Sequence, residues 1–126
     1  MSNRAISSPA APKAIGPYSQ AILANNTLYV SGQLPIDAAT GAFAPGGIKE
    51  QCHQSLKNVG HILNEAGFSY RDVVKATVYL SDMGNFAAMN EVYAEYFTEP
   101  FPARVAYQVA ALPKAALVEI DVIAVK

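Results

Sequence analysis

The chain has 126 residues, of which 52% are hydrophobic and only 15% are charged. Its formal net charge is -1 and its nine lysine and arginine residues are scattered, so it lacks the basic cluster with which proteins follow nucleic-acid phosphates. The single cysteine excludes an internal disulfide, and no apolar run is long enough for a membrane span or typical of a signal peptide. We therefore expect one cytoplasmic domain over residues 1–126 that binds neither nucleic acid nor membrane. Its apolar surplus requires either a dense core or, as we favour, burial against other subunits.

The first part of the chain predicts a hairpin. Before this hairpin, we expect an extended lead segment that contains two prolines. Two short apolar runs within residues 18–30 then flank Asn25-Asn26, and asparagine tolerates the left-handed backbone of tight turns. Residues 28–31 form the predicted second strand, and Thr40-Gly41 marks another turn.

A helix follows Gly46-Gly47. Apolar residues recur at spacings of three and four, which is the period of one helix face, and Gly67 stands at a plausible end. The stripe consists of Ile48, Cys52, Leu56, Val59, Ile62, Leu63 and Ala66. We interpret Cys52 as a buried small apolar residue. The two histidines lie beside the stripe, without the spacing of a metal site.

The second half alternates strand, helix and two strands. Residues 73–80 are rich in β-branched side chains and predict a strand. A second helix begins near Asn85 and is stopped by the prolines at 100 and 102, with its apolar face made by Phe86, Met89, Tyr93 and Phe97. Two strands, at about 104–111 and 117–125, end the chain.

The order ββ, α, β, α, ββ predicts an α+β protein in which two helices cover one face of a single sheet. The other sheet face would be bare in a monomer. The last strand is apolar on both faces near its end, as in strands that are covered on both sides. Oligomer contacts are therefore expected.

Arg104 and Glu119 each stand in otherwise uncharged, strand-forming surroundings. If the last two strands form a hairpin centred near 111–112, the two residues face each other as a cross-strand ion pair worth about 0.2–1 kcal/mol. These strands could instead pair with others in the sheet. In the functional alternative, the fork of Arg104 binds a substrate carboxylate through two hydrogen bonds while Glu119 holds and deprotonates a water.

Three other places are candidates for ligand contact. Tyr18 follows a Gly-Pro turn and is either a ligand contact or a core or interface residue. Ser31 and Gly32 end a strand, where the missing glycine side chain permits close approach of a ligand. Asn90 is polar within an apolar stretch of the second helix, as a ligand donor or on its solvent side.

Several of these segments resemble one family at matching spacing. They are residues 15–20 (IGPYSQ), 30–35 (VSGQLP), 74–80 (VKATVYL), the second helix through Asn90 and Tyr93, Pro102-Ala103-Arg104 with Val109, Leu112-Pro113, and Val118-Glu119-Ile120. Over essentially its whole length, the sequence is similar to the Rid/YjgF reactive-intermediate deaminases.

The resemblance implies a chorismate-mutase-like fold, three sheets packed as a homotrimer around a central barrel, and three sites between subunits. It also implies hydrolysis of 2-aminoacrylate and 2-aminocrotonate, through their imines, to pyruvate and 2-oxobutanoate without cofactor or metal. Arg104 corresponds to the carboxylate-binding arginine and Glu119 to the glutamate that handles water. Tyr18, Ser31, Gly32 and Asn90 correspond to cleft-lining positions.

The sequence departs from the family at one motif. Many members have Arg-Ser-Cys where this chain has Arg104-Val105-Ala106, and a glutamate where Gln108 stands. If the position of Ala106 contributes mainly its backbone groups to the substrate, the loss of the thiol is tolerable. If the thiol itself assists, the activity or the choice of substrate changes.

Three alternatives to this deaminase remain open. They are a non-catalytic trimer that binds a small keto acid, an endoribonuclease or translation inhibitor, and a deaminase of a bulkier imine. The near-neutral charge argues against the RNA-directed alternative.

Overall fold

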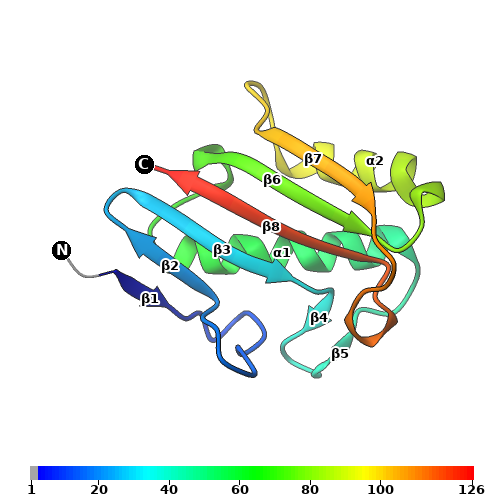
Figure 1. Ribbon diagram of the computed structural model, residues 1–126, viewed down its shortest axis with the longest axis horizontal. Coiled ribbons are helices and arrows are strands. Elements are labelled where there is room, and N and C mark those ends of the chain that lie inside the picture. Colours follow the sequence, from blue (N-terminus) through cyan, green and yellow to red (C-terminus); the bar gives the residue numbers. More distant parts are fainter. Residues whose placement is uncertain (1–2) are drawn as a thin grey trace.

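A computed structural model describes residues 3–126 as one six-stranded mixed sheet with two helices behind it, which confirms the predicted mixed sheet with two helices (Figure 1). The strands of this sheet are β1 (Arg4–Ile6), β2 (Ala21–Ala24), β3 (Thr27–Gln33), β6 (Val73–Leu80), β7 (Ala103–Gln108) and β8 (Val118–Val125). The helices are α1 (Ile48–Glu65) and α2 (Phe86–Tyr96). A small hairpin contains β4 (Ile36–Asp37) and β5 (Ala42–Phe43), and short 3₁₀ turns cover Tyr70–Asp72, Met83–Asn85 and Pro113–Ala115.

The strand order is β1-β2-β3-β8-β6-β7, so the last strand of the chain lies inside the sheet. The predicted hairpin is confirmed as β2 and β3, and Asn25 in the connecting turn has φ 56°. All pairs in the sheet are antiparallel except β6 with β7, which α2 connects. A helix between two strands returns the chain to its starting edge, and this permits parallel pairing.

The helical stripe predicted for residues 48–66 lies against the sheet. Its central members, including Leu56, Val59 and Ile62, are fully buried. The amide of Phe68 donates to the carbonyl of Leu63, and Gly67 has φ 81°. This geometry ends α1 at the glycine that the sequence indicated. Cys52 is buried, as predicted, and burial raises its pKa to about 12.

The structure adds to or corrects the sequence prediction at four points. The lead segment contributes an edge strand, β1, and the turn at Thr40-Gly41 joins two short strands, β4 and β5, that were not predicted. The strand expected over 104–111 ends at Gln108. The last two strands form no hairpin, because β6 lies between β7 and β8.

The sheet face opposite the helices carries exposed large side chains, as expected from the apolar surplus. Among them are Tyr29 (49% exposed), Val105 (40%) and Tyr107 (46%). Tyr29 pairs with Ile123, and Tyr107 pairs with Tyr79, on the face away from the core. Below, "open face" means this sheet face. No helix within residues 3–126 is both long and apolar enough to cross a membrane.

Candidate active site

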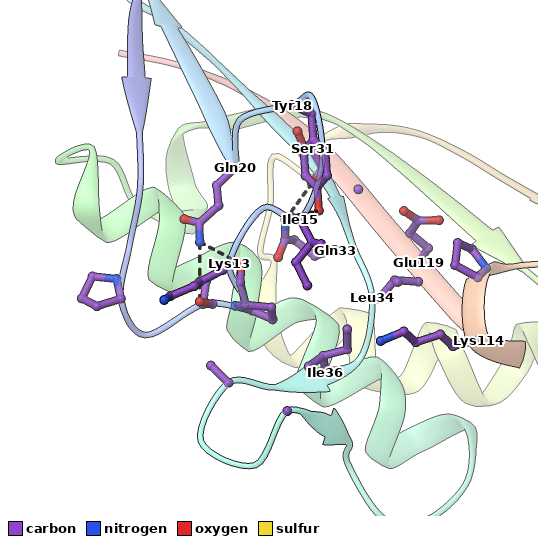
Figure 2. A pocket seen from close by; sticks show the side chains of 17 residues that line it. Lys13, Ile15, Tyr18, Gln20, Ser31, Gln33, Leu34, Ile36, Lys114 and Glu119 are labelled. Carbon is purple, nitrogen blue, oxygen red and sulfur yellow. Dashed lines mark hydrogen bonds between the residues drawn. The ribbon is translucent and has the colours of Figure 1, made fainter.

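A cavity of about 870 Å³ opens at the end of β3, within the usual size range of small-molecule sites (Figure 2). It contains four of the residues predicted from the sequence, namely Tyr18, Ser31, Gly32 and Glu119. Figure 2 shows Tyr18 and Ser31 on one side and Glu119 and Lys114 on the other. The remaining walls are largely apolar, made by the loop that precedes β2 and by residues between β3 and β5.

The loop before β2 is held against the sheet by Gln20. The buried amide of Gln20 accepts from the Ser8 amide at 2.7 Å and donates to the Pro12 carbonyl at 2.8 Å. Ser31 adds a second tie, since its hydroxyl donates to the Ser19 carbonyl at 2.6 Å. The Ser31 hydroxyl therefore stabilises the wall of the cavity. Because its hydrogen is used in this bond, it can only accept a hydrogen bond from a ligand. The ring of Tyr18 at the loop's end is 53% exposed, so it is no core residue of a single chain.

Glu119 lies over Gly32. The register of β3 with β8 shifts between Val30 and Gln33, which removes Ser31 and Gly32 from the regular ladder. A Cβ placed on Gly32 would overlap the Glu119 carboxylate. The sequence analysis interpreted the missing side chain of Gly32 as space for a ligand. In the structure, this space first accommodates the Glu119 carboxylate.

The Glu119 carboxylate is unusually basic and unpaired. Burial, and then the negative charge of Asp121, raise its pKa above the ordinary value. Within residues 3–126 it forms no hydrogen bond or ion pair. A carboxylate with a raised pKa at the wall of a cavity is suited to proton transfer with a ligand or water.

Arg104 lies elsewhere, between β7 and α2. Its Nη1 donates to Asn90 Oδ1 at 2.7 Å, and its guanidinium stacks on the rings of Tyr93 (4.8 Å) and Phe86 (5.6 Å). Each stack contributes about 0.5–2 kcal/mol. Within the described part of the chain Arg104 has no acidic partner. Ala106, two residues on, faces the same way and packs against the core.

The structure shows that the predicted cross-strand pair of Arg104 and Glu119 is wrong. Arg104 pairs with Ala76, and Glu119 pairs with Tyr79. Ala76 is fully buried on the helix side, whereas Tyr79 points to the open face. Arg104 and Glu119 therefore lie on opposite faces of the sheet, and one chain cannot place both against one small ligand.

The sequence analysis missed the residues that hold these groups. Phe86 and Tyr93 were assigned only to an apolar helix face, although an arginine flanked by uncharged strand residues requires stacking or hydrogen bonding nearby. Asn58 was also missed: its amide is buried and donates to the carbonyls of Leu34 and Ile36, which line the cavity. Within residues 3–126 no cluster of histidine, cysteine or acidic side chains is arranged to hold a metal.

The fold is that of an α+β protein, and its cavity, with the Glu119 carboxylate at the wall, is a candidate small-molecule site. Residues 8–126 match the family model described as endoribonuclease L-PSP, and the chain belongs to this family. It is 56% identical over 123 residues to the 2-iminobutanoate/2-iminopropanoate deaminase of Capra hircus, covering 98% of this chain and 90% of that protein.

Solved structures agree over the whole chain. RidA from the Antarctic bacterium Psychrobacter sp. PAMC 21119 superposes with a TM-score of 0.94 at 46% identity, covering 98% of this chain and 99% of that one. TdcF from E. coli, solved with bound serine, superposes with a TM-score of 0.93 at 40% identity and covers 98% of both chains.

Proposed function

We propose that the protein is a hydrolytic deaminase that converts 2-iminobutanoate and 2-iminopropanoate, the imines of 2-aminocrotonate and 2-aminoacrylate, into 2-oxobutanoate and pyruvate with release of ammonia. The observation that carries this proposal is the unpaired, basic carboxylate of Glu119 at the wall of an open cavity. The name of the Capra hircus relative supports the same chemistry. Because imines already hydrolyse in water, the site has only to bind, orient and transfer protons, and the reaction requires no cofactor or metal.

In this mechanism Arg104 binds the substrate carboxylate through two hydrogen bonds, while Asn90 and the two rings keep the guanidinium in place. Glu119 takes a proton from water as the water oxygen bonds to C2 of the protonated imine. Glu119 then gives that proton to the nitrogen of the resulting carbinolamine and, as a carboxylate again, takes the proton of its hydroxyl group while the C–N bond breaks. The second carbonyl bond forms, ammonia leaves, and the proton on Glu119 passes to ammonia or water. Tyr18, Ser31 and Gly32 line the substrate position beside Glu119, and the backbone of Ala106 contacts the substrate beside Arg104.

Arg104 and Glu119 lie on opposite faces of the sheet, which supports a site that takes the two residues from different chains. We accordingly propose a homotrimer of chorismate-mutase-like architecture, in which three open faces pack around a central barrel and each site takes Arg104 from one chain and Glu119 from its neighbour. The exposed Tyr29, Val105 and Tyr107 of the open face support this packing. The one cysteine, buried and lacking a disulfide partner, suits work in the reducing cytoplasm.

The test is a coupled assay in which an amino-acid oxidase generates short-lived imines and keto-acid release is followed with and without the protein. Arg104→Ala and Glu119→Gln should each reduce the protein-dependent rate by at least about a hundredfold, because each removes a group that acts on the reacting molecule. Circular dichroism and sedimentation should show the wild-type fold and assembly. Full activity in either variant would contradict the assignment of that residue.

The same variants separate the deaminase from a trimer that only binds a keto acid. A binding protein would keep its affinity for 2-oxobutanoate in Glu119→Gln and would show no protein-dependent keto-acid release in the wild type. The family description makes RNA cleavage a necessary control. Protein freed of trace nuclease should leave RNA intact, as its net charge of -1 leads us to expect.

A further inference from the structure

Tyr79 and Asp121 form a hydrogen-bonded pair beside Glu119 on the open face. The Tyr79 hydroxyl donates to Asp121 Oδ2 at 2.7 Å. Tyr79 is the direct cross-strand partner of Glu119, and Asp121 follows Glu119 by two residues, so all three side chains share one face. The ring of Tyr107 lies 5.7 Å from that of Tyr79 and supports it from β7.

We propose that Asp121, fixed by the Tyr79 hydroxyl on the strand face that carries Glu119, is a positioning residue that controls proton transfer between the Glu119 carboxylate and water. This inference rests on the proposed function. It assigns to the Tyr79–Asp121 pair a role that requires no contact with the substrate.

The charges around Glu119 support this role. Asp121 is the charged group that raises the pKa of Glu119, after burial itself. The hydrogen bond to Asp121, with burial, raises the pKa of the Tyr79 hydroxyl well above its ordinary value, so Tyr79 remains a donor throughout the working range. On the neighbouring strands, β3 presents only Ser31 and Gly32 here.

Other titratable groups of the same chain face this region but form no ion pair with the two carboxylates within residues 3–126. They are Tyr107 of β7, Lys75 further along β6, Tyr18 and Lys13 of the loop before β2, and Lys114 of the turn before β8. In the proposed assembly, Arg104 of the neighbouring chain binds the substrate carboxylate and is constant across the variants compared below. The charge of Asp121, two residues from Glu119 on one strand face, therefore acts directly on the Glu119 carboxylate and makes it harder to ionise.

The consequence is a defined pH dependence. Glu119 must be ionised to accept a proton from water, so kcat/KM falls as the pH drops through its pKa. Asp121→Asn removes the like charge while keeping an acceptor oxygen for Tyr79. It should lower the pKa of Glu119 and move the acidic limb of the profile to lower pH by about 0.5–1 unit. Asp121→Glu keeps the charge and should leave the limb near its wild-type position.

Tyr79→Phe should move the limb in the same direction as Asp121→Asn but by less. Without the hydroxyl, Asp121 is no longer held on the face of Glu119, so solvent screens its charge and its effect on the pKa of Glu119 decreases. Tyr29→Phe is the matched control, because Tyr29 lies on the same open face and its hydroxyl forms no hydrogen bond within residues 3–126. Its profile should match that of the wild type.

A uniform loss of kcat/KM at every pH in Asp121→Asn, with an unmoved limb, would overturn the inference, since a merely structural role predicts that result. A second readout separates it from the proposed function. The ¹³C titration of the Glu119 carboxyl, assigned by its loss in Glu119→Gln, should move to a lower midpoint in Asp121→Asn. If the midpoint moves but the wild type releases no keto acid, Asp121 acts on Glu119 as proposed and the deaminase function is contradicted. If the wild type is active but the midpoint does not move, the proposed effect of Asp121 on Glu119 is contradicted.

Discussion

At the scale of single residues, the proposed site depends on two charged groups, Glu119 and Arg104, that have no partner of opposite charge within residues 3–126. The Glu119 carboxylate can take its position only because residue 32 is glycine, since any side chain on Gly32 would occupy the space of the carboxylate. Arg104 owes its fixed position to Asn90 and two aromatic rings. Neither residue is paired with the opposite charge within residues 3–126, so each retains its capacity to act on a ligand.

Gly32→Ala tests the close approach. The added methyl group would displace the Glu119 carboxylate, so kcat/KM should fall by about tenfold to a hundredfold while binding of a keto-acid product changes less. Steady-state kinetics with product-inhibition constants measures both effects. Gly41→Ala is a useful control for stability, because its Cβ would meet no atom within 4 Å, although its φ of 75° makes it strained. An unchanged rate in Gly32→Ala would place the working position of Glu119 away from Gly32.

Arg104→Lys tests the geometry of carboxylate binding. Lysine keeps the charge but has no planar fork with which to bind Asn90 and a carboxylate together. We expect kcat/KM to fall by about tenfold to a hundredfold, chiefly through KM, since the interaction is made with the substrate before reaction. Isothermal titration with 2-oxobutanoate should show a parallel loss of affinity. A lysine variant with wild-type KM would show that charge alone is sufficient.

At the scale of elements, short polar contacts hold the cavity walls. The loop before β2 is fixed by the buried amide of Gln20, and the chain after β3 is fixed by Asn58. Both side chains satisfy backbone groups that have no place in the sheet. Such contacts leave little trace in a sequence pattern, because a single glutamine or asparagine has no periodicity.

Gln20→Leu should loosen this wall. The Ser8 amide and the Pro12 carbonyl would lose their partner, so the free energy of unfolding should fall by about 1–3 kcal/mol and KM should rise. Urea denaturation and kinetics measure the two effects. Gln108→Leu is the matched control: Gln108 is exposed and accepts one backbone hydrogen bond, from Met83, so a smaller loss is expected. Equal effects in the two variants would contradict a special role for Gln20.

Periodicity in the sequence predicts α1, α2 and the strands β3, β6 and β8, because each buries a regular face. The pairing of β7 was predicted incorrectly, although the sequence held the signal: a helix between β6 and β7 favours parallel neighbours over a hairpin of β7 with β8. The central place of β8 depends on contacts between distant segments, which local patterns do not encode. For the same reason the sequence could nominate Arg104 and Glu119 but could not place them on opposite faces.

At the scale of the whole molecule, the sheet separates the two halves of the site. Arg104, Asn90 and Ala106 lie on the side of β7 that faces α2, while Glu119 and Gly32 belong to the cavity at the end of β3. A functional site that uses both halves must therefore lie between chains, and the exposed aromatic residues of the open face offer surface for such an assembly.

Subunit mixing tests this separation directly. Arg104→Ala and Glu119→Gln chains are each inactive alone, but a site between two chains is intact when the Glu119→Gln chain supplies its arginine and the Arg104→Ala chain supplies its glutamate. If equal amounts of differently tagged chains are unfolded, mixed and refolded, random assembly into closed rings should restore about a quarter of wild-type activity. All of this restored activity should be found in the mixed oligomers purified through both tags. Refolding either variant alone should restore no activity. Mixed oligomers of confirmed composition that are inactive would contradict a site shared between chains. Arg104 and Glu119 would then either bind one ligand within one chain or not share a ligand at all. The register of β6 with β7 and β8 forbids the first of these explanations.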